Sequence, residues 1–357
     1  MKISPMIKEE ITTSSPTGSA DRSGIVIAGN MLTDHVKCID AYPKKGMLAS
    51  ITAQSRAVGG CVPNTGIDLA KIDSSIPIEG IGILGDDDSG RYVLKELQKV
   101  GISTKYVTVS REYATSYSDV MSVVSTGERT FFHYRGANAA FSPADIPLNQ
   151  LQCRMLHIAY ILLLDQFDQP DAEYGTVMAR FLKEVQDKGI RTSIDVVSDS
   201  AERFSEYVLP ALRYTDNAIM NEIECCGAAG ISPRDDAGNL CFNNLRTAME
   251  FVMEHGVGER VILHCPELGM ILNKNGEFTA VGSLKLPSGY IKGSVGAGDA
   301  FCAGCLYGIY HGLSDREILE FASGAAACNL SAEDSVSGMK SKDEILALIN
   351  ALPRIPI

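Results

Sequence analysis

A glycine-rich stretch late in the chain carries the most specific chemical pattern in the sequence. Residues 293–301 read GSVGAGDAF, and the apolar spacing after them predicts a helix over 300–310, so small residues lie where that helix begins. The first N–H groups of a helix have no internal partner, and small residues let an anion approach them closely. We therefore expect Gly296, Ala297 and Gly298 to form an anion hole.

Asp299 adds a carboxylate to this helix start. Asp is also among the commonest helix caps, and capping alone would explain its presence. Beside an anion hole, however, an ionised carboxylate can take the proton of an attacking alcohol while the N–H groups stabilise the departing charge. This pairing is typical of phosphoryl transfer to a hydroxyl, with Asp299 as the general base.

Competing motifs are missing from the sequence. It contains no G-x-x-x-x-G-K-[ST] loop, no H-R-D or D-F-G set, no H-E-x-x-H and no G-x-S-x-G. A dinucleotide fingerprint would need a third glycine where Phe301 stands, which argues against a nicotinamide-dependent oxidoreductase.

Alternating strand and helix patterns must position these residues. Strand-like runs occur at 25–28, 80–84, 156–163, 191–196, 217–220 and 260–264, and helical periods at 65–72, 91–100 and 172–188. Such alternation is typical of parallel βαβ units. The predicted fold class is therefore α/β, a doubly wound, mostly parallel sheet with helices on both faces.

Two helix-poor stretches interrupt this alternation. Runs at 116–124 and 129–134 read as strands joined by a hairpin, and 35–56 lacks a helical period. Strands from 35–56 and 106–137 could form a small separate β-sheet that acts as a lid over a ligand, or they could be edge strands of the main sheet. We predict one domain over 24–357 with this lid, preceded by a flexible tail at 1–23.

Composition limits the classes of partner. The net charge is −12 and no Lys/Arg cluster is present, so we expect no nucleic-acid partner. No run reaches the ~18 apolar residues of a membrane span, so we expect no membrane association. The ten cysteines are interpreted as reduced, mostly buried thiols, which indicates a cytoplasmic protein.

Four local patterns together resemble one family. Residues 296–301 (GAGDAF) resemble the C-terminal signature of the ribokinase-like (PfkB) carbohydrate kinases, and 59–64 (GGCVPN) resemble the family's sugar-binding turn, Gly-Gly-x-x-x-Asn. Asp34 is similar to the family Asp that holds sugar hydroxyls after the first strand. Residues 221–224 (NEIE) are similar to the Asn-x-x-Glu motif of the Mg–phosphate region. The resemblance covers roughly residues 24–350.

The resemblance implies a function and a set of site residues. The family transfers phosphate from ATP, with Mg²⁺, to a CH₂–OH group of a sugar or nucleoside, so ATP, Mg²⁺ and a small-molecule sugar are the implied ligands. The implied sugar-binding residues and further candidates are Asp34, Gly60, Asn64, Arg135, Asn138 and Asp165. The implied nucleotide-binding residues are Asn221, His264, Gly269, Ala326 and Asn329, with Glu224 acting indirectly on the Mg–phosphate region.

The sequence departs from the family pattern in two places. The family often has an Asp where Gly293 stands, a ligand for an activating monovalent cation, so potassium activation is not carried over. The nucleotide stretch usually reads Thr-x-Gly-x-x-Gly, whereas 264–269 read HCPELG, in which Gly269 alone matches. This departure leaves three alternatives open. The nucleotide pocket could be changed, the enzyme could use another phosphoryl donor, or the protein could be a catalytically impaired sugar-binding regulator.

The sequence leaves the substrate open. Arg135 could pair with the carboxylate of an acidic sugar, in loose resemblance to the 2-keto-3-deoxygluconate branch, or could lie exposed on a lid strand. Ketoses, sugar acids and nucleosides all stay candidates, with a nucleoside kinase of the same fold as the main alternative. Lid-mediated dimers occur in the family, so a homodimer through the lid is implied by resemblance alone.

Overall fold

The main sheet has the predicted mostly parallel α/β architecture. The computed structural model describes residues 22–126, 128–198 and 203–357. Within these residues the main sheet has eight strands, in the order β16-β15-β14-β13-β12-β9-β1-β4. They are β1 (Ile25–Gly29), β4 (Ile78–Ile81), β9 (Met155–Ile161), β12 (Arg191–Val196), β13 (Asn217–Asn221), β14 (Arg260–His264), β15 (Leu268–Asn273) and β16 (Phe278–Gly282). All adjacent pairs from β4 to β14 are parallel, and β15 and β16 form an antiparallel edge.

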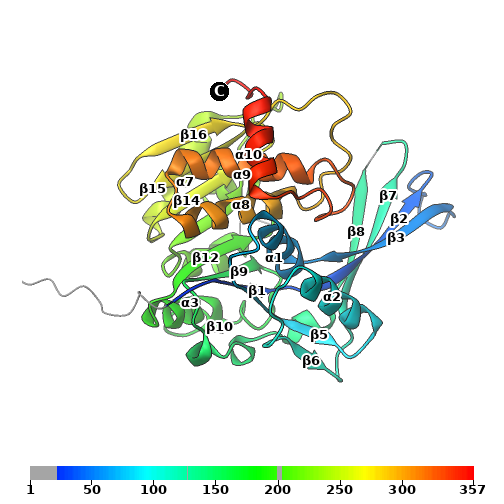
Figure 1. Cartoon of the computed structure of the whole chain (residues 1–357), viewed down its shortest axis with the longest axis horizontal. Coiled ribbons are helices and arrows are strands. Elements are labelled where there is room, and N and C mark those ends of the chain that lie inside the picture. Colours follow the sequence, from blue (N-terminus) through cyan, green and yellow to red (C-terminus); the bar gives the residue numbers. More distant parts are fainter. Residues whose placement is uncertain (1–21, 127, 199–202) are drawn as a thin grey trace, which may run out of the picture.

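Helices cover both faces of this sheet (Figure 1). Strand β1 is buried on both sides, since Ile25 and Ile27 belong to one hydrophobic cluster and Val26 and Ala28 to the other. The helices are α1 (Cys61–Ile72), α2 (Asp88–Lys99), α3 (Val177–Asp187), α5 (Leu209–Leu212), α6 (Glu222–Ala228), α7 (Phe242–Glu254), α8 (Ala297–His311), α9 (Asp315–Asn329) and α10 (Lys342–Ala351). The predicted fold class is confirmed.

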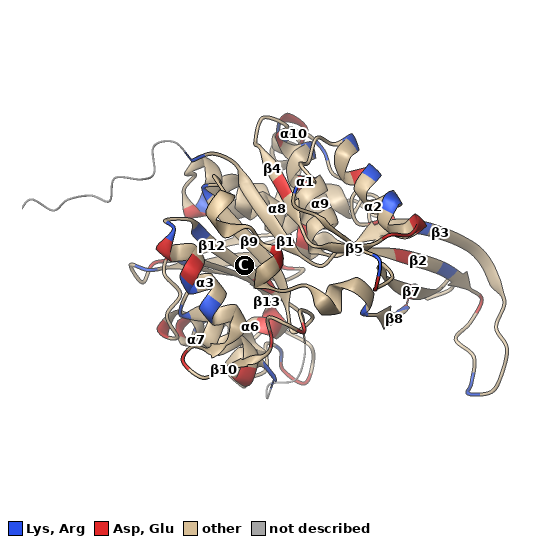
Figure 2. Ribbon diagram, turned by 90° about the horizontal axis from the view of Figure 1, so that it is seen from below, with Lys and Arg blue, Asp and Glu red and all other residues tan. Residues whose placement is uncertain are grey.

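A separate four-stranded sheet stands apart from the main sheet in the described part of the chain, in the order β3-β2-β7-β8. Its strands are β2 (Leu32–Ile39), β3 (Ile51–Gly59), β7 (Ser116–Val123) and β8 (Arg129–Tyr134). Figures 1 and 2 show this sheet projecting from the body beyond α2. The alternative that these segments are edge strands of the main sheet is therefore wrong. We call this sheet the lid.

The lid takes up less of the chain than was predicted. Residues 80–84 do not form one strand: β4 ends at Ile81, and a new strand begins at Ile83. Between them lies Gly82, where a Cβ would be 2.7 Å from the carbonyl oxygen of Gly29. Strand β5 (Ile83–Gly85) after the break pairs with β6 (Thr108–Ser110) in a two-stranded sheet. Within the range 106–137, from which lid strands were predicted, β6 therefore pairs outside the lid.

Helix α3 begins five residues later than the pattern predicted. The Asp171 carboxylate accepts hydrogen bonds from the N–H groups of Glu173 and Tyr174, which holds a turn between the short strands β10 (Pro170–Asp171) and β11 (Gly175–Thr176). The Thr176 hydroxyl then accepts from the N–H of Ala179 and caps the helix.

Most of the predicted tail at 1–23 cannot be compared with the structure. Residues 1–21 lie outside the described residues. Arg22 and Ser23 bind the domain, since Arg22 donates to the Lys188 carbonyl at 2.8 Å and the Ser23 N–H donates to the Gln152 carbonyl at 3.0 Å. All ten cysteines are free, including Cys302 and Cys305, which are buried within α8. In the described ranges no helix has the length and apolar character needed to cross a membrane.

Candidate active site

Helix α8 begins at the predicted anion hole. Its N-cap, Gly296, has φ of 77°, and a Cβ at this position would lie 2.6 Å from Cβ of Ser335. Both the backbone conformation and the close approach of Ser335 therefore require glycine here. Ala297 and Gly298 follow as the first helical residues, so their N–H groups carry the partial positive charge of the helix start.

The carboxylate of Asp299 is buried in the first turn of α8 and accepts three side-chain hydrogen bonds. The Tyr160 hydroxyl donates to Oδ1 at 2.8 Å, the Thr65 hydroxyl to Oδ1 at 3.3 Å, and the Asn64 amide to Oδ2 at 3.1 Å. Burial raises the pKa of Asp299 to about 6, and the three hydrogen bonds oppose this shift. Asp299 is therefore mostly ionised at neutral pH, yet close enough to neutrality to exchange a proton.

Helix α1 presents two of these donors. It begins at Cys61, four residues earlier than predicted, after a sharp turn in which Gly60 has φ of 86° and a Cβ would lie 2.5 Å from the Asn30 carbonyl oxygen. Asn64 therefore lies inside the helix instead of before it. Its amide oxygen accepts from the Ser335 hydroxyl at 2.8 Å, so both ends of the Asn64 amide are held by protein groups.

The turn before α1 also brings Asp34 of the lid strand β2 into the site. A Cβ on Gly59 would lie 2.6 Å from Oδ2 of Asp34, so the carboxylate lies directly against the glycine turn. The pKa of Asp34 is raised to about 7, first by burial and then by repulsion from Asp299, while a hydrogen bond from Ser118 opposes the shift. Asp34 and Asp299, both predicted from the sequence, are therefore close enough for the charge of Asp299 to raise the pKa of Asp34.

Arg135, Asn138 and Asp165 lie where the lid meets the body. Arg135 Nη1 is 3.2 Å from Asp165 Oδ1, and both side chains are partly exposed. Asn138 is fully buried, and its amide oxygen accepts from the N–H of Met31 at 3.2 Å. Asn138 therefore ties the segment after β8 to the end of β1, and Arg135 already has a carboxylate partner.

The Asn221–Glu224 pair forms a capping box at the start of α6. Asn221 Oδ1 accepts from the Glu224 N–H at 2.9 Å, and Glu224 Oε2 accepts from the Asn221 N–H at 2.8 Å. Burial raises the pKa of Glu224 to about 7. Burial also raises the pKa of Asp195, at the end of β12, with repulsion from Glu224 and Asp299 adding to the shift. Asp195 is thus repelled by two other carboxylates at the carboxyl edge of the sheet.

The other residues predicted to bind the nucleotide, Gly269, Ala326 and Asn329, lie in or at the ends of β15 and α9. Gly269 lies in β15, where a Cβ would be 3.0 Å from Leu319 and 3.1 Å from Phe301, so this glycine permits close packing under α8. Asn329 is fully buried at the end of α9 and donates to the Ser335 carbonyl at 2.6 Å, and Ala326 lies one turn earlier. Their contact with a nucleotide stays a prediction.

Sequence reasoning missed Tyr160, Thr65 and Ser335. Tyr160 lies in an apolar run that reads as an ordinary buried strand, and its φ of 52° cannot be seen in the sequence. Ser335 lies in the loop after α9, where nothing marks it out. Thr65 directly follows Asn64 in α1, so its polar side chain next to a predicted site residue was a usable signal.

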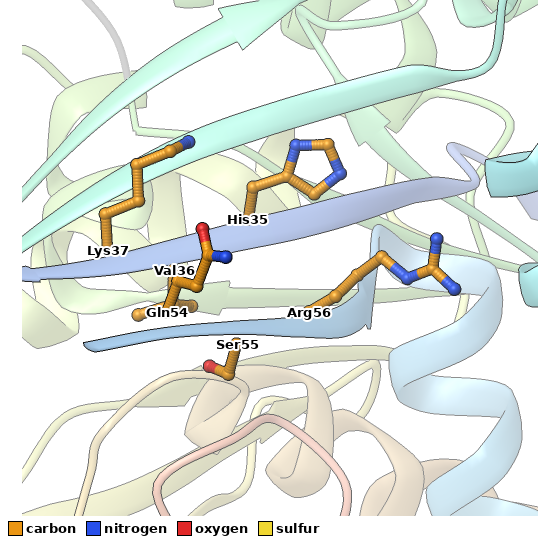
Figure 3. Close-up of a pocket in the computed structure, with 6 residues that line it drawn as sticks. All are labelled: His35, Val36, Lys37, Gln54, Ser55 and Arg56. Atoms are coloured by element: carbon orange, nitrogen blue, oxygen red, sulfur yellow. The ribbon is translucent and has the colours of Figure 1, made fainter.

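A hollow on the lid lies outside this site. Figure 3 shows His35, Lys37, Gln54 and Arg56 on one side of strands β2 and β3 around it. Val36 and Ser55 complete its lining, and none of these six residues is a predicted site residue. The hollow therefore does not belong to the candidate active site.

Comparison with known proteins assigns the family. Residues 24–342 match the model of the pfkB family carbohydrate kinases, so the chain belongs to this family, and the predicted class of phosphotransferase is confirmed. It is a sugar or nucleoside kinase of the ribokinase type.

Individual relatives are distant. Ribokinase of Arabidopsis thaliana is 24% identical over 327 residues, covering 91% of this chain and 80% of the relative. A 5-dehydro-2-deoxygluconokinase of Listeria innocua is 24% identical over 304 residues, covering 83% and 87%. The crystal structure of Thermotoga maritima ribokinase superposes with a TM-score of 0.75 at 19% identity, covering 92% of this chain and 99% of the other. Arabidopsis ribokinase complexed with ribose and ATP gives 0.74 at 19% identity and the same coverage. These structures show the shared fold.

Proposed function

We propose that this chain phosphorylates a hydroxymethyl group of a sugar, with ATP as donor, Mg²⁺ as cofactor and Asp299 as general base. The observation that carries the proposal is the position of Asp299: its buried carboxylate lies in the first turn of α8 and accepts a hydrogen bond from Asn64 of α1, the helix that follows the glycine turn against which Asp34 lies. A base, an anion-binding helix start and a hydroxyl-binding carboxylate are thus neighbours. The relatives named as ribokinase and as 5-dehydro-2-deoxygluconokinase support a sugar acceptor.

The reaction needs one proton acceptor and one anion site. The sugar oxygen attacks the γ-phosphorus of ATP, its proton passes to Asp299, the bond from the γ-phosphorus to the β,γ-bridging oxygen breaks, and ADP leaves. The N–H groups of Ala297 and Gly298 stabilise charge on the migrating phosphoryl group. Hydrogen bonds from Tyr160, Asn64 and Thr65 hold the carboxylate in one orientation.

A divalent cation would be held mainly through water and the donor phosphates, because the described residues contain no cluster of three His, Cys, Asp or Glu side chains that could hold one directly. Glu224 and Asp299 both repel Asp195, and a cation nearby would lower that repulsion. Glu224 and Asp195 would hold Mg²⁺ through water or donor phosphates, as this hard cation prefers oxygen ligands and keeps several waters. Bound Mg²⁺ would neutralise charge on the donor phosphates.

The acceptor is tested with a panel that includes sugar acids. Arg135 favours such acceptors, because a substrate carboxylate could replace Asp165 as its partner. We would measure ADP release with ATP and Mg²⁺ over ribose, fructose, 2-dehydro-3-deoxygluconate, 5-dehydro-2-deoxygluconate and adenosine, with product mass as a second readout. Sugar-dependent ADP release with a phosphorylated product is expected. Sugar binding by calorimetry without ADP release under any metal condition would instead identify a binding regulator.

The lid supports a proposal of self-association. Strand β8 is an edge strand, and Phe131, Phe132 and Tyr134 on it are 57%, 51% and 45% exposed. Burying these rings against a second lid would remove apolar surface from water. A dimer is expected by sedimentation velocity, and Phe131→Ser with Phe132→Ser should give a monomer. A monomeric wild-type protein at micromolar concentration would contradict this proposal.

A further inference from the structure

Three polar side chains form a row across three neighbouring strands of the lid (Figure 1). Asp34 of β2 is paired in register with Ser118 of β7, and Ser118 is paired with His133 of β8. Nδ1 of His133 is 3.1 Å from Oγ of Ser118, and Ser118 in turn hydrogen-bonds the Asp34 carboxylate. The row therefore links the carboxylate that we assign to sugar binding with the edge strand of the lid.

The direction of these hydrogen bonds follows from the charge of Asp34. Ser118 has one hydroxyl proton, and an ionised carboxylate is a stronger acceptor than a neutral imidazole. The Ser118 hydroxyl therefore donates to Asp34, and its oxygen accepts from His133. Because this oxygen can accept only from a protonated Nδ1, the neutral His133 ring carries its proton on Nδ1.

Asp34 is about half ionised at neutral pH, so one hydrogen bond has a large effect on its charge. Burial raises its pKa to about 7, and repulsion from Asp299 of α8 adds to the shift. The hydrogen bond from Ser118 and the positive charge of Arg129 on β8 oppose it. At pH values below the pKa, each further unit of increase in the pKa lowers the ionised fraction about tenfold.

His133 is neutral under the same conditions. Burial lowers its pKa, the positive charge of Arg135 adds to this effect, and the negative charge of Asp165 opposes it. Nε2 of His133 makes no hydrogen bond among the described residues, so Nδ1 is the ring atom through which His133 acts on the row.

We propose that Ser118 and His133 are positioning residues, in which His133 donates from Nδ1 to Ser118 and Ser118 donates to Asp34, so that Asp34 stays ionised and oriented for the hydroxyls of the acceptor sugar. This inference rests on the proposed kinase function and on the role of Asp34 within it. Because His133 belongs to the edge strand β8 and Asp34 to β2, sugar affinity then depends on the pairing of three lid strands.

Two NMR measurements test the row without any enzyme activity. Aspartate labelled with ¹³C at the carboxyl group reports the pKa of Asp34, assigned with Asp34→Asn, and ¹⁵N-labelled histidine reports the proton position in the His133 ring, assigned with His133→Phe. We expect the wild-type ring to carry its proton on Nδ1 at pH 8. Ser118→Ala should raise the pKa of Asp34 by about one pH unit or more, as loss of a hydrogen bond to a charged group does.

Ser122→Ala is the matched control for Ser118→Ala. Ser122 lies four residues further along β7, and its hydroxyl makes no hydrogen bond within the described part of the chain. This variant should leave both the pKa of Asp34 and the His133 proton position as in the wild type.

Calorimetry with the accepted sugar measures the effect on binding. Ser118→Ala should weaken binding ~10-fold at pH 6 and much less at pH 9, where Asp34 is mostly ionised in both proteins. The kcat at saturating sugar should change little, because the affected contact is made before the chemical step. His133→Phe should show part of the same loss, and His133→Asn, whose amide N–H lies near the position of Nδ1, should restore affinity.

A wild-type His133 ring protonated on Nε2 at pH 8, an unchanged pKa of Asp34 in Ser118→Ala, or an equal loss of sugar affinity at pH 6 and pH 9 would overturn the inference. If wild-type protein consumes no ATP with any acceptor, the proposed function fails. The two NMR measurements still decide in that case whether Ser118 and His133 control the charge of Asp34.

Discussion

The hydroxyl of Tyr160 donates a 2.8 Å hydrogen bond to Oδ1 of Asp299, and it does so from a backbone with φ of 52°. Leu162, two residues later, has φ of 82°. Positive φ at a bulky residue is strained and persists where the surrounding structure enforces it. The end of β9 is therefore strained at the point where it supports the proposed base.

Replacing Tyr160 by Phe should shift the pH dependence of catalysis. The Tyr160 hydrogen bond lowers the pKa of Asp299, so its loss should raise that pKa above about 6. A general base works when deprotonated, so the rate falls as pH drops through its pKa. The acidic limb of the kcat–pH profile should move to higher pH, with a larger loss of rate at pH 6 than at pH 8. An equal loss at both pH values would show that the hydroxyl does not tune Asp299.

Asp299→Asn tests the base itself. The amide oxygen can still accept a hydrogen bond but cannot take a proton, so kcat should fall by ~10² or more while sugar affinity changes little. Single-turnover rates and calorimetry with the accepted sugar measure the two effects. Asp343→Asn, at an exposed position in the first turn of α10, serves as the control and should behave as wild type. Equal kcat in Asp299→Asn and wild type would refute the assignment.

Gly296→Ala and Gly276→Ala form a matched pair for the anion hole. The two glycines have φ of 77° and 81°, so an alanine pays a similar conformational cost at each, ~1–2 kcal/mol. A Cβ at Gly276 meets nothing within 4 Å, whereas a Cβ at Gly296 would lie 2.6 Å from Ser335. Urea denaturation should show a larger loss of stability for Gly296→Ala, and this variant alone should lose activity. Equal stability losses in the two variants would mean that Ser335 can move away from the added Cβ without a measurable cost in stability.

Asp68→Asn should stabilise the protein in a pH-dependent way. Asp68 lies in α1, and both of its carboxylate oxygens are buried without a hydrogen-bond partner among the described residues. Burial, followed by repulsion from Asp299, raises its pKa well above 3.8. The native state therefore binds the proton more tightly than the unfolded state does, and the associated stability is lost as pH rises above 3.8.

The gain of Asp68→Asn over wild type should thus be larger at pH 8 than at pH 4. Melting temperatures at the two pH values, with Asp343→Asn as the control, measure this difference. A gain that is the same at both pH values, or a loss that grows with pH, would contradict the burial of an unpaired carboxylate.

The sequence by itself determined the features that depend on neighbouring residues. Gly60 and Gly296 mark helix starts, because a positive φ and a close approach by neighbouring atoms both require a missing side chain there. The alternation of strand and helix patterns predicted the parallel sheet, and the helix-poor stretches predicted a second sheet. The predicted starts of α1 and α3 were wrong by four and five residues: the sharp turn at Gly60 sets the start at Cys61, and the Thr176 cap sets the start at Val177.

Only the tertiary structure decided which side chains surround the base. Tyr160 and Asp299 are 139 positions apart in the chain, and Asn64 and Ser335 are 271 apart, so no local pattern links them. The parallel pairing of β2 with β7 likewise joins distant segments and fixes Asp34 beside Ser118. Such contacts depend on how the whole chain packs, because burial and long-range pairing set both the position and the pKa of each carboxylate.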